Sequence, residues 1–137
     1  MVPYLDLHCD TLELGFLKKK EDIFDLPEGM LDINRMKAAG MYGQFFAVFF
    51  PSQGREWMPE DEVYYQALKK LFYTSLDRHK DCISYAGSGK EAEKNFKEGK
   101  MSAFLTIEDG RHVEGKLANL ERFYQDGVRL ISLTWNY

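Results

Sequence analysis

The sequence predicts an α/β fold built on a parallel sheet. Short apolar runs alternate with amphipathic helical patterns along the chain. Every connection between consecutive runs is long enough for the right-handed crossover that joins parallel strands. Hydrophobic residues make up 45% of the 137 residues, which is enough for a sizeable core. We therefore expect a single domain over residues 1–137 in which strands and helices alternate.

The first expected strand is YLDLHCDTLEL, at residues 4–14. Successive side chains of a strand point to opposite faces, so Asp6, His8 and Asp10 are predicted to share one face. The other face would carry Leu5, Leu7 and Cys9. One face is expected to be buried against helices, and the other to face water or carry chemistry.

The next elements follow from caps and periodicity. Asp32 is a good N-cap for a short helix that ends at Gly40. The run QFFAVFFP is apolar on both faces and predicts a covered strand that stops at Pro51. Residues 59–79 have helical spacing behind an acidic first turn, which suits the positive end of a helix. The segment DCISYA, residues 81–86, fits either a short strand or an extended link.

The last third of the chain repeats the alternation. Ser88 and Glu91 form a capping box for a helix. The run MSAFLTIEDG, residues 101–110, predicts an apolar strand that ends in acidic residues. A helix follows and is closed by Gly127, and VRLISLTWN, residues 128–136, predicts the fourth long strand.

Composition argues against several classes of protein. A formal net charge of −4 disfavours nucleic-acid binding, which needs clustered lysine and arginine. We expect no membrane partner and a cytoplasmic location, because no apolar run is long enough to span a bilayer and no secretory signal is visible. Cys9 and Cys82 do not form a C-x-x-C pair and are expected to be reduced and buried.

Three side chains are candidates for a metal site. His8 and Asp10 are two residues apart, which on a strand places their Cα atoms about 7 Å apart on one face. A partly solvated strand would show the same polar alternation, so this pair alone does not distinguish a metal site from an ordinary solvent-exposed face. Glu108 ends its predicted strand at the carboxyl edge, where parallel folds bind ligands, although it could also belong to the cap of the next helix. Asp109 could fill that capping role instead. Imidazole and carboxylate donors are a set suited to zinc, which activates water and polarises carbonyl groups.

Three other candidates are discounted. Cys9 is expected to be a small buried residue on the opposite face from His8 rather than a nucleophile. His112 is interpreted as a solvent-exposed loop residue, and His79 as a partner of a helix C-terminus.

Four segments together resemble one known family. LDLHCDTLE, AAGMYGQFFAVF, LTIEDG and DGVRLISLTWN are similar, in order and approximate spacing, to the N-terminal half of the renal, or membrane, dipeptidase family of zinc peptidases. The resemblance implies a (β/α)8 barrel of the metal-dependent hydrolase type, with about four of its eight strands in this chain. It also implies two zinc ions in the intact site. His8 and Asp10 match the H-x-D pair that holds one zinc, and Glu108 matches the carboxylate that bridges both.

The chain departs from the family pattern at two places. The histidines of the second zinc and the acid/base carboxylate are expected beyond residue 137, so we expect at most one zinc to be well bound here. Many members have Thr-His-Asn where this chain has Thr134, Trp135 and Asn136. Trp135 is therefore a candidate substrate-binding residue that alters dipeptide specificity.

The resemblance implies a zinc-dependent hydrolase that cleaves dipeptides or related small amides with a metal-bridging hydroxide. These residues alone are expected to be inactive, and the remainder of the barrel or a second copy is the expected partner, besides a small peptide substrate. An alternative is a compact, flavodoxin-like α/β module that binds a ligand or partner without catalysis.

Overall fold

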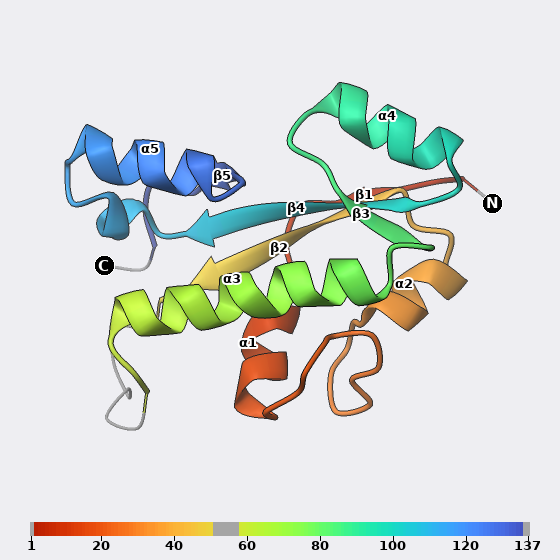
Figure 1. The fold of residues 1–137 in the computed structure, drawn as a ribbon, viewed down its shortest axis with the longest axis horizontal. Helices are drawn as coiled ribbons and strands as arrows, with labels where there is room; N and C mark the ends of the chain where they lie inside the picture. Colours follow the sequence, from red (N-terminus) through yellow and green to blue (C-terminus); the bar gives the residue numbers. More distant parts are fainter. Residues whose placement is uncertain (1, 51–57, 136–137) are drawn as a thin grey trace.

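The computed structural model describes residues 2–50 and 58–135. They form a sheet of five strands in which every pair is parallel, flanked by helices (Figure 1). The predicted α/β class with a parallel sheet is confirmed, and over the described residues the sheet is open rather than closed into a barrel.

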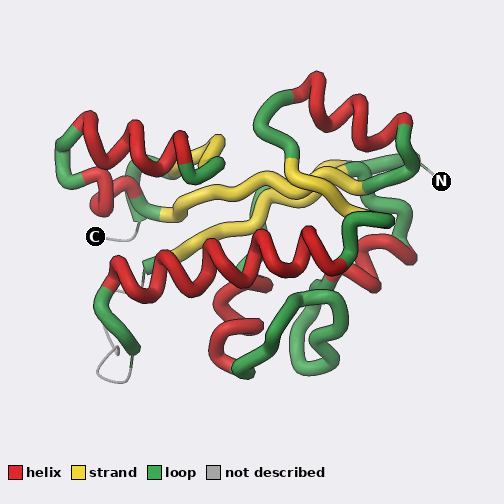
Figure 2. The backbone as a smooth tube through the Cα atoms, in the orientation of Figure 1, coloured by secondary structure: helices red, strands yellow, loops and turns green. Residues whose placement is uncertain are grey.

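All of the strands except the third along the chain lie side by side in chain order. The strands are β1 (Leu5–Asp6), β2 (Gly43–Phe49), β3 (Ile83–Tyr85), β4 (Met101–Glu108) and β5 (Val128–Ile131). β2 pairs with β1 on one edge and with β4 on the other. The far edge of β4 is shared, because β3 pairs with its beginning and β5 with its end (Figure 2). Segment 81–86, for which a strand or a link was expected, therefore contains a strand.

Helices cover both faces of the sheet. The helices are α1 (Thr11–Leu17), α2 (Ile33–Ala38), α3 (Asp61–Arg78), α4 (Gly89–Lys97) and α5 (Leu117–Gln125). Figure 1 shows α1, α2 and α3 on one side of the strands and α4 on the other. The chain moves outward along the sheet from β2 to β3 and back from β3 to β4. Two right-handed crossovers that run in opposite directions place their helices on opposite faces.

Alternate side chains of β2 and β4 form two apolar layers. On the α3 side, Phe46 and Leu105 belong to the main core together with Leu68 of the helix. On the opposite side, Phe45 stacks on Phe104 with ring centroids 4.3 Å apart, in a smaller cluster that includes Ala92 of α4. Burial on both faces explains why the sequences of these two strands read as nearly continuous apolar runs.

The predicted helix caps are present. The Asp32 carboxylate accepts a hydrogen bond from the Arg35 amide at 2.7 Å, and the Ser88 hydroxyl accepts one from the Glu91 amide at 3.3 Å. The helix expected over 59–79 is α3, and the strand expected over 128–136 ends as β5 at Ile131. Pro51 and Asn136, the expected ends of two strands, lie outside the described residues.

The first segment differs from the expected strand over residues 4–14. β1 has only two residues, and α1 begins at Thr11. Hydrogen bonding to β2 nevertheless resumes, because the Cys9 amide donates to the Phe45 carbonyl at 3.1 Å and the Ala47 amide donates to the Cys9 carbonyl at 3.0 Å. In a parallel pair these two bonds place Cys9 opposite Phe46.

The register shows one extra residue in this segment. Asp6 lies opposite Gln44, and Cys9 lies opposite Phe46, so three steps along the first segment match two steps along β2. A bulge of this kind interrupts the alternation of faces. The register places Asp6 on the face of Cys9, and the expectation that Asp6 and His8 share a face is wrong.

The apolar residues of the segment are not buried as a set. Cys9 is 7% exposed, as predicted, whereas Leu5 is 45% and Leu7 60% exposed. β1 is an edge strand, so only β2 covers it within the sheet.

No helix among residues 2–50 and 58–135 combines the length and apolar character needed to cross a bilayer. The cytoplasmic location stays a prediction.

Candidate metal centre

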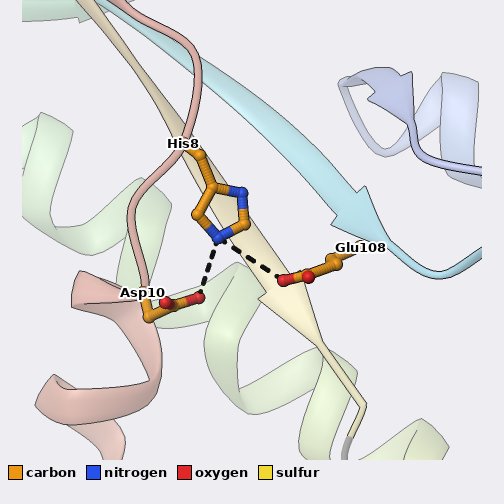
Figure 3. Close-up of side chains that lie close together, drawn as sticks. All are labelled: His8, Asp10 and Glu108. Atoms are coloured by element: carbon orange, nitrogen blue, oxygen red, sulfur yellow. Dashed lines mark hydrogen bonds and ion pairs between the residues drawn. The ribbon is translucent and has the colours of Figure 1, made fainter. Parts of the chain in front are cut away.

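Two neighbouring side chains, His8 and Asp10, meet a third from a distant part of the chain, Glu108, at the carboxyl edge of the sheet. His8 follows β1, Asp10 directly precedes α1, and Glu108 is the last residue of β4 (Figure 3). The carboxyl ends of parallel strands meet at one edge, which is why residues 100 positions apart converge. The structure thus brings together all three residues that the sequence singled out as metal ligands.

The distances suit a metal ion. His8 Nε2 lies 3.2 Å from Asp10 Oδ1 and 3.4 Å from Glu108 Oε2. One donor atom from each of the three side chains lies within 4.8 Å of the others. Ligands of tetrahedral zinc, at bonds of about 2.0–2.2 Å, are separated from one another by about 3.3–3.6 Å. The two separations from His8 Nε2 are close to that range.

The centre is open to solvent. The side chains of His8 and Asp10 are 48% and 58% exposed, and that of Glu108 is 23% exposed. A groove of about 350 Å³ adjoins the first two residues. Its lining is His8, Cys9, Asp10, Thr11, Leu14, Met30 and Leu31. A small molecule can therefore reach the candidate ligands.

The local backbone structure sets the directions of the His8 and Asp10 side chains. The bulge turns His8 to the opposite face from the buried Cys9. The Asp10 carbonyl accepts the first hydrogen bond of α1 from the Leu14 amide at 3.2 Å, but its side chain makes no capping hydrogen bond. The Asp10 carboxylate is thus left to face His8.

The electrostatics favour a cation. Glu13 lies in the first turn of α1, within the segment that the sequence predicts as a strand, and is a further carboxylate near the centre. Burial, followed by the charges of Asp10 and Glu108, raises the pKa of Glu13. Its sequence signal is the spacing of three from Asp10, which brings side chains together only on a helix.

Asp109 has the capping role that the sequence allowed as an alternative to Glu108. Its side chain is 1% exposed and accepts a hydrogen bond from the Arg111 amide at 3.0 Å, capping a short 3₁₀ helix at Gly110–Val113. Glu108 is therefore not needed as the cap.

Trp135 lies near the centre without joining it. Its ring centroid is 4.8 Å from that of Phe49, and Phe49 is the residue of β2 paired with Glu108. A role in substrate binding stays a prediction.

The other two histidines lie elsewhere. His79 stacks on Phe24 with centroids 4.1 Å apart. His112 stacks on Phe50 at 3.7 Å, and its side chain is only 17% exposed. The prediction of an exposed loop histidine at 112 is wrong, because the 3₁₀ helix packs this ring against the end of β2.

The free cysteines are buried, as predicted. Burial raises the pKa of the Cys9 thiol to about 11, so the nucleophilic thiolate is scarce at neutral pH. Cys9 is a core residue despite its position between two candidate ligands.

Solved structures share this fold. A dipeptidase of family M19 is 23% identical, with a TM-score of 0.77 over 98% of this chain and 43% of its own. A metallopeptidase from Rhodobacter sphaeroides, solved with a phosphinate mimic of the dipeptide L-Ala-D-Ala, is 19% identical, with a TM-score of 0.75 over 98% of this chain and 46% of its own. At these identities the likeness establishes the fold.

Sequence comparison establishes the family. Dipeptidase ataJ of Aspergillus terreus is 25% identical over 143 residues, which cover 96% of this chain. The chain spans about a third of the length of that relative, 35%. The sequence model of the membrane dipeptidase family, peptidase family M19, matches residues 1–137. With the parallel fold and the His-Asp-Glu cluster at its carboxyl edge, this match shows that the chain belongs to the membrane dipeptidase family.

Proposed function

We propose that His8, Asp10 and Glu108 bind a divalent metal ion, with zinc as the expected ion, in an enzyme that hydrolyses dipeptides or related small amides. The main observation behind this proposal is that His8 Nε2 lies within 3.4 Å of carboxylate oxygens of two other residues, the nearby Asp10 and the distant Glu108. Membership of a dipeptidase family supports the reaction class.

The donor set fits a metal by its chemistry. His8 would supply an imidazole nitrogen, and Asp10 and Glu108 would supply carboxylate oxygens, a donor set that suits a divalent cation. A bound zinc ion polarises a peptide carbonyl and lowers the pKa of water. Within this chain, His8, Asp10 and Glu108 would hold the cation at the solvent-exposed edge of the sheet.

The resemblance to zinc dipeptidases extends this proposal. Glu108 would bridge two ions, and the second set of ligands and the acid/base group would come from beyond residue 137. Metal held there would supply an activated water molecule as the nucleophile. The described residues alone are then expected to bind metal but not to turn over substrate.

The open sheet supports the proposal that residues 1–137 are the N-terminal half of an eight-stranded barrel. β5 has a partner on one edge only among the described strands. Next to it, a groove of about 590 Å³ is lined largely by apolar side chains of α5 and β5. Leu117 in this groove is 82% exposed. The remainder of a barrel or a second copy would cover this surface.

Metal titration tests the proposed site. Cobalt(II) absorbance and zinc calorimetry are expected to show one tight ion per chain, and His8→Ala should weaken binding at least tenfold. His79→Ala is the matched control, because His79 stacks on Phe24 away from the centre. No binding, or equal binding by the His8 variant, would overturn the proposal.

Two further measurements bear on the same site. Zinc at 100 times its Kd should raise the free energy of unfolding by about 2.7 kcal/mol. For a chain of 137 residues this corresponds to a rise of about 9 °C in Tm. A phosphinate dipeptide mimic, the ligand class seen with the Rhodobacter sphaeroides relative, should bind only to the metal-loaded protein. Binding of the mimic without metal would contradict a metal-centred site.

A further inference from the structure

The backbone turns sharply directly after Glu108. Asp109 has φ 83° and ψ 106°, a conformation with positive φ that residues other than glycine rarely adopt. Glycine would take up this conformation without a steric penalty. A strained non-glycine residue persists only where surrounding contacts hold it, and such residues gather at functional sites.

Contacts of the Asp109 side chain tie this corner to β2. The Asp109 carboxylate is 1% exposed, accepts a hydrogen bond from the Arg111 amide at 3.0 Å, and lies 2.6 Å from Arg111 Nε. Arg111 Nη2 donates to the carbonyl of Phe50, directly after β2, at 3.2 Å. The side chain thus links the ends of β4 and β2.

Contacts of the Asp109 backbone tie the same corner to β5. The Asp109 amide donates to the Ser132 hydroxyl at 2.9 Å, and the Ser132 amide donates to the Ile107 carbonyl at 3.0 Å. The next residue, Gly110, is so close to the chain after β5 that a Cβ there would lie 3.2 Å from the Leu133 carbonyl oxygen. The corner is therefore held on both sides.

We propose that Asp109 is a positioning residue that fixes the direction of the Glu108 carboxylate toward His8 and thereby sets the affinity of the metal site. The Asp109 carboxylate contacts Arg111. Its effect on Glu108 is therefore indirect, through the backbone that joins residues 108 and 109. This inference rests on the proposed metal-binding function. Residues that orient a ligand typically change metal affinity 10- to 100-fold when they are replaced.

Cobalt(II) titration of Asp109 variants tests the inference, with affinity and the visible spectrum as readouts. Asp109→Gly accommodates the positive φ but lacks the carboxylate, so we expect binding to weaken about 10-fold or more and the spectrum to change. Asp109→Asn keeps an acceptor for the Arg111 amide and tolerates positive φ, so it should stay within about 3-fold of the wild type. Rescue by asparagine would separate positioning from a purely ionic effect.

Asp32→Ala is the matched control. Asp32 is also a buried aspartate that accepts from the amide and guanidinium of a following arginine, Arg35, but it caps α2 instead of ending a strand at the centre. Its replacement should lower Tm while leaving cobalt affinity and spectrum unchanged. A purely structural Asp109 would behave like this control.

The outcomes separate the two proposals. If Asp109→Gly binds cobalt with wild-type affinity and spectrum while His8→Ala does not bind, the positioning role is overturned and the metal site stands. If the wild type does not bind, or His8→Ala binds equally well, the proposed function fails and the positioning role fails with it. If Asp109→Gly does not fold, Ser132→Ala tests the positioning role instead, because it removes only the acceptor of the Asp109 amide. An unchanged affinity and spectrum in that variant overturns the positioning role, and weaker binding supports it.

Discussion

Asp32 is a buried aspartate that is held by three hydrogen bonds and an ion pair with Arg35. Its side chain, 2% exposed, accepts hydrogen bonds from the Leu26 amide at 3.0 Å, the Arg35 amide at 2.7 Å and Arg35 Nε at 2.8 Å. Arg35 also donates to the carbonyls of Gly29 and Leu26, at 2.6 and 2.5 Å. The pair therefore fixes the loop before α2.

Asp32→Asn preserves the size of the side chain and one acceptor for the helix cap, but removes the charge. Removing the charge of this buried carboxylate weakens its three hydrogen bonds and its pairing with the partly exposed Arg35, which should lower the free energy of unfolding by about 2–4 kcal/mol. For 137 residues the unfolding entropy is about 0.29 kcal/mol/K, so Tm should fall by about 7–14 °C. Ser88→Ala, which removes an exposed cap of α4, should cost only about 1 kcal/mol.

The effect of Asp32→Asn should depend on pH. Burial raises the pKa of Asp32, but the hydrogen bonds and charge of Arg35 outweigh it, and the net shift is downward. A lowered pKa contributes stability above the unfolded value of about 3.9, and this stability is lost as pH falls through the folded value. Urea unfolding at neutral pH and below pH 4 measures the difference. An effect equal at both pH values, or smaller than that of Ser88→Ala, would refute the reasoning.

Three further outcomes are expected. Leu68→Ala, in the core, should lower the free energy of unfolding measured in urea by about 2–5 kcal/mol. Leu117 is 82% exposed, so Leu117→Ala should lower it by less than about 0.5 kcal/mol. A large loss of stability for Leu117→Ala would mean that its groove is covered in solution. Cys9, with its pKa raised by burial, should react with iodoacetamide at pH 8 only in denaturant, and rapid labelling of the native protein would contradict its burial. Gly127→Ala should lower the free energy of unfolding by about 2 kcal/mol or more, because φ is 99° and a Cβ would lie 2.1 Å from the Tyr73 hydroxyl; an unchanged Tm would contradict this.

The strongly patterned segments were predictable from the sequence. β2 and β4 are apolar on both faces because helices or aromatic clusters cover each side, and buried parallel strands have this pattern. The meeting of Glu108 with His8 and Asp10 followed from the rule that strand ends share an edge. Caps at Asp32 and Ser88 were predictable because they depend only on local hydrogen bonds.

Other features depended on tertiary contacts that single-sequence patterns do not encode. The alternation of residues 4–14 suited a strand, but the extra residue before Cys9 and the start of α1 at Thr11 are fixed by hydrogen bonding to β2. The place of β3 beside the far edge of β4 is set by the path of the chain through α3 and α4. His112 is partly buried by stacking on Phe50, a residue 62 positions away.

β4 is paired along both edges, by β2 on one side and by β3 and β5 on the other. Backbone amides in such a ladder open to solvent only when the sheet itself comes apart. In heavy water, the amide protons of β4 should therefore be among the last to be replaced by deuterium. Glu108 is the last residue of β4. Metal binding at Glu108 should therefore slow the exchange of the β4 amides further, and this added protection would report how metal binding stabilises the fold.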